Sequence, residues 1–70
     1  MNVKEQHRCL AILDATIGET PVKWAAIRDA VSQQMTIANW LDVRGVLQWA
    51  INDGRFERVR DVHVEAYQRV

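Results

Sequence analysis

Cysteine is nearly absent from this sequence, where Cys9 is the only one. A single cysteine excludes an intrachain disulfide, and a four-ligand zinc site lacks its ligands. We therefore expect Cys9 to be a buried structural thiol in a reducing compartment. Long apolar runs are missing as well, because none approaches the roughly 20 residues that span a bilayer. The segment 4–8 is charged and lacks the apolar core of a signal peptide. The sequence predicts a cytoplasmic protein with no membrane partner.

An excess of charge of either sign is also missing, because nine Lys and Arg side chains balance nine Asp and Glu side chains. Domains that hold nucleic acid over a broad surface are usually clearly basic, so the balance weighs against that mode. Glycine-rich phosphate loops, nucleophile elbows and metal-ligand clusters are not found. His7 and His63 have no cysteine or carboxylate at ligand spacing. The sequence thus predicts no enzyme, no metal, no cofactor and no small-molecule substrate.

The clearest positive signal is an apolar stripe within residues 36–53. On a helical wheel centred on Leu47, the apolar residues of this segment gather on one side. Thr36 can cap the start of the helix with its hydroxyl group, and Gly54 supplies a left-handed stop. We therefore expect one helix that forms the spine of a small core. The stripe consists of Trp40, Val43, Leu47, Ala50 and Ile51.

Two shorter helices are expected before it, at residues 3–17 and 21–31. The first has an apolar face and ends at Gly18. The second begins with Thr20 as N-cap and Pro21 at the first helical position, where a missing N–H costs nothing. The core faces are Cys9, Leu10, Leu13, Thr16 and Ile17 on the first helix and Trp24, Ile27, Ala30 and Val31 on the second.

After Gly54 the pattern changes to β-branched and aromatic residues that alternate with charges, which indicates a half-exposed hairpin at about 55–69. We expect strands at about 55–60 and 62/63–69, with a turn near Asp61. The alternation slips between Val64 and Tyr67, where we expect a β-bulge. A short C-terminal helix is the competing interpretation.

This order of elements resembles that of winged helix-turn-helix domains, and a run of residues strengthens the resemblance. In that superfamily a Val-Arg pair, a Leu, a small residue and a Gly lead from the third helix into an apolar-x-Arg strand. The residues are Val43, Arg44, Leu47, Ala50, Gly54, Phe56 and Arg58. The resemblance implies one α+β, mainly α, domain over 1–70, with three helices and a C-terminal β-hairpin. In compactness the chain is similar to small regulators of phages and other mobile elements.

The resemblance also implies a function, because many winged-helix proteins place the third helix in the major groove and the hairpin on the DNA backbone. The partner would be double-stranded DNA, bound by a dimer that regulates transcription or another DNA transaction. Asn39 and Gln48 suit adenine edges. Carried over by position, the DNA-binding residues are Asn39, Asp42, Arg44, Gln48 and Asn52 on the third helix, Arg55, Arg58 and Arg60 on the hairpin, and Lys23 and Arg28 on the second helix.

The outer face of the third helix also supports an alternative, since it offers few of the Arg, Lys, Ser or Thr residues typical of groove-entering helices. Small residues beside an exposed tryptophan would allow another helix to approach closely, and tryptophan is enriched at interface hot spots. The alternative is a winged-helix module that binds itself or another protein without touching DNA. Its interface would be Ala38, Leu41, Gly45 and Trp49. Trp49 could instead fold against the hairpin or the first helix, and the hairpin arginines could pair with Glu65 across the strands.

Overall fold

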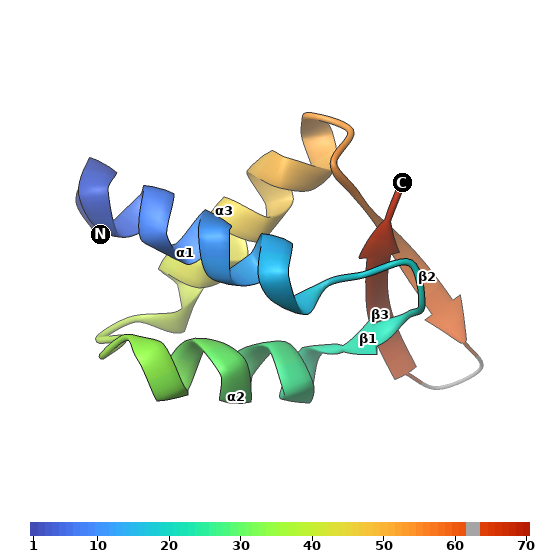
Figure 1. The fold of residues 1–70 in the computed structure, drawn as a ribbon, viewed down its shortest axis with the longest axis horizontal. Coiled ribbons are helices and arrows are strands. Elements are labelled where there is room, and N and C mark those ends of the chain that lie inside the picture. Colours follow the sequence, from blue (N-terminus) through green and yellow to red (C-terminus); the bar gives the residue numbers. More distant parts are fainter. Residues whose placement is uncertain (62–63) are drawn as a thin grey trace.

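The computed structural model describes residues 1–61 and 64–70. It confirms an α+β, mainly helical fold in which three helices precede an antiparallel hairpin, a topology consistent with a winged helix (Figure 1). The elements, in chain order, are α1 (Val3–Thr16), β1 (Val22–Lys23), α2 (Trp24–Gln34), α3 (Trp40–Asn52), β2 (Phe56–Asp61) and β3 (Val64–Arg69).

The sheet stands at one end of the helices, and its strand order is β1-β3-β2 (Figure 1). β1 was not expected from the sequence. Its two residues pair antiparallel with the middle of β3, so that Val22 lies opposite Tyr67. A two-residue strand has no periodicity of its own to detect. Its formation depends on β3, which the chain reaches more than 40 residues later.

The core lies where α1, α2 and α3 meet the inner face of the sheet. The stripe centred on Leu47 is buried at Val43, Leu47 and Ala50, whereas Trp40 and Ile51 are half-buried. Cys9 is fully buried, and burial raises the pKa of its thiol. Ile12, which is not on the expected core face of its helix, is also buried. The buried cluster consists of Cys9, Ile12, Leu13, Ile17, Ile27, Val31, Val43, Leu47, Ala50, Phe56 and Tyr67. Within the described residues, no helix has the length and apolarity needed to cross a membrane.

The predicted start of the second helix is wrong. Thr20 and Pro21 precede β1, and α2 begins three residues later than expected, at Trp24, with Lys23 as a cap that makes no side-chain hydrogen bond. The helix also runs on to Gln34. The physical reason is competition for backbone groups, because pairing with β3 holds Val22 and Lys23 in extended conformation.

The predicted start of the third helix is also wrong, because Asn39 rather than Thr36 is its N-cap. The Asn39 side chain accepts a hydrogen bond of 3.0 Å from the backbone N–H of Leu41. Asn is at least as good a cap as Thr, and it directly precedes the helix. At the other end Gly54 has φ of 82°, the left-handed conformation expected there.

The hairpin follows one continuous register from Phe56 opposite Arg69 to Asp61 opposite Val64. No bulge interrupts it, and no C-terminal helix forms among the described residues. The alternation of apolar and polar residues is interrupted in β3 because β3 is the central strand of the sheet. Tyr67 is buried against the helices, and the small Ala66 beside it is covered by its neighbours on both sides. Asp61, where the turn was predicted, is the last residue of β2, and the predicted strand start at 62/63 lies outside the described residues.

Candidate functional site

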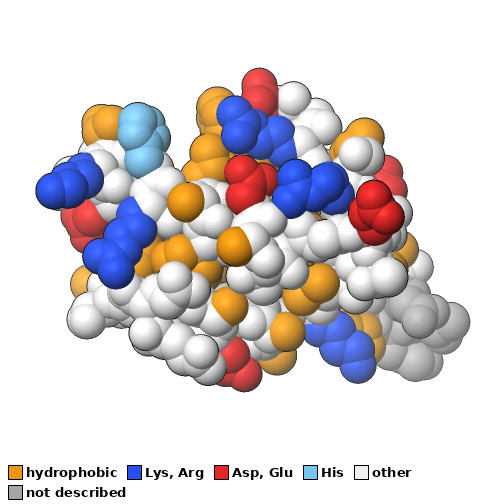
Figure 2. Space-filling view, in the orientation of Figure 1, with side chains coloured by type: hydrophobic (Ala, Val, Ile, Leu, Met, Phe, Trp, Pro, Cys, Tyr) orange, Lys and Arg blue, Asp and Glu red, His pale blue; other side chains and the backbone are white. Residues whose placement is uncertain are grey.

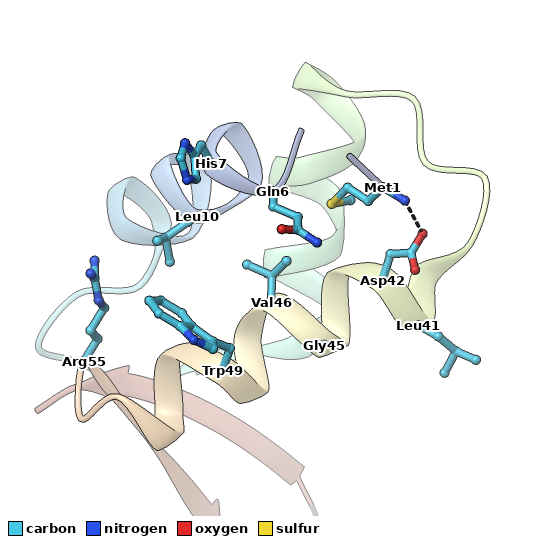
Figure 3. A pocket seen from close by; sticks show the side chains of 10 residues that line it. All are labelled: Met1, Gln6, His7, Leu10, Leu41, Asp42, Gly45, Val46, Trp49 and Arg55. Atoms are coloured by element: carbon cyan, nitrogen blue, oxygen red, sulfur yellow. Dashed lines mark hydrogen bonds and ion pairs between the residues drawn. The ribbon is translucent and has the colours of Figure 1, made fainter. Parts of the chain in front are cut away.

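Two concave surfaces flank α3, one on the hairpin side and one on the α1 side. The hairpin hollow has a volume of about 310 Å³ and is lined by Arg44, Gln48, Arg58 and Tyr67, among others. The helix groove has a volume of about 520 Å³ and lies between α3 and α1 (Figure 3). Gly45 lines both surfaces. The outward face of α3 is therefore divided between two neighbours.

A chain of polar side chains crosses the hairpin hollow from α3 to β3. Gln48 Nε2 donates to Asn52 Oδ1 at 3.0 Å, four residues along α3. Arg58 on β2 donates to Gln48 Oε1 at 3.2 Å. The same guanidinium group forms an ion pair of 2.9 Å with Glu65 on β3. These contacts orient two amides and one guanidinium group on a single surface.

Tyr67 forms the floor of this hollow and is only 1 % exposed. Burial is the main cause that raises the pKa of its hydroxyl group, and hydrogen bonding and charge repulsion from Glu65 add to the rise. Arg58 opposes the rise, and its guanidinium carbon lies 5.9 Å from the centre of the Tyr67 ring. The phenol thus stays neutral, and Arg58 and Glu65 lie over it.

Two further guanidinium groups, those of Arg28 and Arg44, are held by tryptophan rings where α2 and α3 begin. The rings of Trp24 and Trp40 meet edge to face, with centroids 6.2 Å apart. Arg44 stacks over Trp24 at 4.3 Å, and Arg28 stacks over Trp40 at 5.0 Å. Cation–π contacts of this kind restrain a guanidinium group and leave its N–H groups available. Arg44 thereby reaches the hairpin hollow from the α3 side.

The helix groove is more apolar, and its charged groups lie near its ends. Val46 and the ring of Trp49 face α1 across the groove, whereas Leu41 points away from α1 at the groove's edge (Figure 3). Trp49 is 52 % exposed and Leu41 is 72 % exposed. At one end the Met1 amine contacts the Asp42 carboxylate at 3.3 Å. At the other end Arg55 stacks over Trp49 at 5.3 Å and pairs with Asp53.

The residues expected to bind DNA are divided by the fold. Arg44, Gln48 and Arg58 come together in the hairpin hollow, and Asn52 joins them through Gln48. Asp42 and Arg55 line the helix groove instead, on the other side of α3. The remaining four are Asn39, whose side-chain oxygen caps α3, Lys23 in β1, Arg28 over Trp40, and Arg60, exposed on β2.

The residues expected at a protein interface are brought together more completely. Leu41, Gly45 and Trp49 all line the helix groove. Ala38 was placed on the same helical face but precedes the Asn39 cap, outside α3. Sequence reasoning missed the α1 side of the groove. The α1 residues that line the groove carry no sequence motif, because only the packing of α1 on α3 brings them to the groove. They are Gln6, His7 and Leu10, joined by Met1.

Charges of both signs are interspersed on the face seen in Figure 2, where several blue side chains have a red neighbour. Arg69 and Asp14, for example, form an ion pair with an N–O distance of 3.6 Å. This arrangement agrees with the balanced composition of the chain. Any attraction for a polyanion must therefore come from a local group of arginines, such as that of the hairpin hollow.

Comparison with protein-family models, with curated proteins and with solved structures finds no match for this chain. What connects it to known folds is its topology, which is consistent with a winged helix.

Proposed function

We propose that the protein is a small winged-helix DNA-binding protein that regulates transcription or another DNA transaction. In this proposal α3 enters the major groove and the hairpin lies on the DNA backbone. The observation that carries the proposal is the hairpin hollow, where Arg44, Gln48 and Arg58 from two separate elements share one surface. The hydrogen bond between Arg58 and Gln48 joins the hairpin to α3, so both elements could contact one duplex together.

The chemistry of the hollow suits this task. Gln48 and Asn52 carry amides, which can pair with the N6 and N7 atoms of adenine, and the arginines can contact phosphate or guanine. Arg58 is already paired with Glu65, but both side chains remain more than a third exposed. An exposed ion pair is worth about 1 kcal/mol or less, so a phosphate group can replace the carboxylate.

The test is binding of random duplex DNA at increasing salt concentration. We expect the logarithm of the affinity to fall linearly with the logarithm of salt concentration. Replacing Arg58 and Arg60 with alanine should reduce that slope by about two, one unit for each lost phosphate contact. Replacing Lys4 and Arg8 with alanine is the matched control, because it removes the same charge from exposed positions on α1, outside the hairpin hollow. Absence of binding by micromolar protein at low salt would refute the proposal.

A second candidate function is protein binding through the helix groove. The specific observation in its favour is the exposure of two large apolar side chains, Leu41 and Trp49, beside a groove between two helices. Apolar groups gathered in this way commonly mark interaction sites. On this candidate function, the outer face of α3 meets another protein instead of a duplex.

A further inference from the structure

We infer that the helix groove is occupied by a second copy of this chain, with the two α3 helices antiparallel and crossing at Gly45. The inference rests on the second candidate function and names its partner. Three features of the groove support it: the spacing of its side chains, their shapes and the position of its charges.

The spacing is symmetric about Gly45. Leu41 lies four residues before this glycine and Trp49 four residues after it, so each is about 6 Å away along the helix axis. A two-fold axis at Gly45 therefore brings Leu41 of each copy to the level of Trp49 of the other. A two-fold dimer requires such reciprocal contacts, in which each copy contributes the same two residues to the interface.

The shapes are complementary as well. Leu41 is 72 % exposed and points outward, whereas the groove beside Trp49 is hollow (Figure 3). Each copy therefore has both a projection and a recess. Gly45 lies between them, and a Cβ atom built on it would meet nothing within 4 Å. Without a side chain at this point, two helices can approach closely.

The charges select the antiparallel orientation. Asp42 lies beside Leu41, and its side chain remains 44 % exposed despite its contact with the Met1 amine. The guanidinium group of Arg55 lies over the Trp49 ring at the opposite end of the groove, and its side chain remains 41 % exposed despite its ion pair with Asp53. Antiparallel helices bring Asp42 of each copy near Arg55 of the other. Parallel helices would set like charges against each other, which costs affinity.

This arrangement uses the outward face of α3, including Gly45, which also lines the hairpin hollow. A paired chain therefore cannot insert α3 into a DNA groove. In this inference the dimer is the form in which α3 is covered and the single chain is the form that would contact DNA, which replaces the DNA-bound dimer expected from the resemblance. Dimerisation and DNA binding would then compete.

The test is the oligomeric state of the intact chain, measured by sedimentation equilibrium from micromolar to millimolar concentration. We expect a reversible monomer–dimer equilibrium. Gly45→Leu should weaken it about tenfold or more, because the new side chain holds the crossing helices apart. The monomer should stay folded, since the site is open and leucine favours helix more than glycine does. Ala25→Leu, at an exposed position on α2, is the control for added apolar surface.

Charge exchange tests the orientation. Asp42→Arg and Arg55→Asp should each weaken the dimer. The double variant should recover affinity because the two charges are exchanged. Circular dichroism checks that each variant is folded. A lack of recovery would overturn the antiparallel arrangement. Association of Gly45→Leu that equals or exceeds that of the original chain would reveal unspecific apolar contact and overturn the inference. A chain that is monomeric at every concentration would also overturn it, while leaving the groove open to a different protein and the DNA measurement unaffected.

Discussion

The two sides of α3 differ in how their side chains are engaged. On the hairpin side, Gln48 and Arg58 are bonded to each other above the buried Tyr67. In the helix groove, Trp49 faces α1 and Leu41 lies at the groove's edge, and each has more than half of its area exposed. The same helix thus forms an ordered polar surface with the hairpin and an apolar groove with α1.

This difference is the basis on which we propose a local site for a polyanion in a chain without net charge. Arg28 and Arg44 are restrained by tryptophan rings, and Arg58 is restrained by Gln48 and Glu65. Restrained side chains lose less entropy when they bind a ligand. In the helix groove, binding of the protein partner that we propose would instead be favoured by burial of apolar area.

The largest expected contrast is in the loss of stability when an aromatic residue is removed from each side of α3. Tyr67→Ala removes a buried ring and should lower the free energy of unfolding by about 3 kcal/mol or more. Trp49→Ala removes a half-exposed ring and should cost about 1 kcal/mol or less. Urea denaturation of both variants at a concentration where the chain is monomeric provides the measurement. Unfolding of Trp49→Ala would show that the ring belongs to the core and that the groove has no exposed anchor. If Tyr67→Ala is too unstable to measure, Tyr67→Leu should show a smaller loss of the same sign.

Two glycines on and after α3 provide the next contrast. Gly54 has a positive φ of 82° where the helix ends, so Gly54→Ala should destabilise the chain by about 1 kcal/mol. Gly45 lies within the helix with open space around it, so Gly45→Ala should stabilise the chain by up to about 1 kcal/mol. Thermal unfolding of the two variants should therefore shift in opposite directions. A loss of stability in Gly45→Ala would mean that this face of α3 is already packed in the monomer.

The smallest expected effect concerns Glu65, the carboxylate that would compete with phosphate for Arg58 in the proposed DNA complex. Glu65→Gln should raise the affinity for random duplex DNA about threefold at low salt, since one repulsive charge is removed. The matched control is Glu57→Gln on β2. The Glu57 carboxylate accepts a hydrogen bond from Gln68 and lies on the opposite face of the sheet. Equal gains for both variants would show that only total charge matters and that the hairpin hollow has no special role.

Much of the fold follows from local patterns in the sequence. The apolar stripe centred on Leu47 predicts α3 and its buried face because helical periodicity is local and repeated. Gly54 predicts the end of that helix through its conformational freedom. The alternation after Phe56 predicts the hairpin. The start of α3 was placed too early because Thr36 and Asn39 are both suitable caps, and local propensity does not choose between them.

The candidate site was less predictable from the sequence. The helix groove and the hairpin hollow share the outward face of α3 and differ in the element that packs beside it, α1 or the hairpin. Asp42 and Gln48 share the outer face of a helical wheel, yet one lines the helix groove and the other the hairpin hollow. The α1 residues of the groove, such as Leu10, carry no motif that links them to α3.

The sequence by itself determined the helices, the hairpin and the outward face of α3, because these depend on the order of neighbouring residues. Only the tertiary structure decided that β1 forms, that Arg58 reaches Gln48, and that Trp49 faces α1. Each of these depends on contacts between residues that are ten or more positions apart. Such contacts arise when the apolar faces pack together, and the order of residues within each element does not record them.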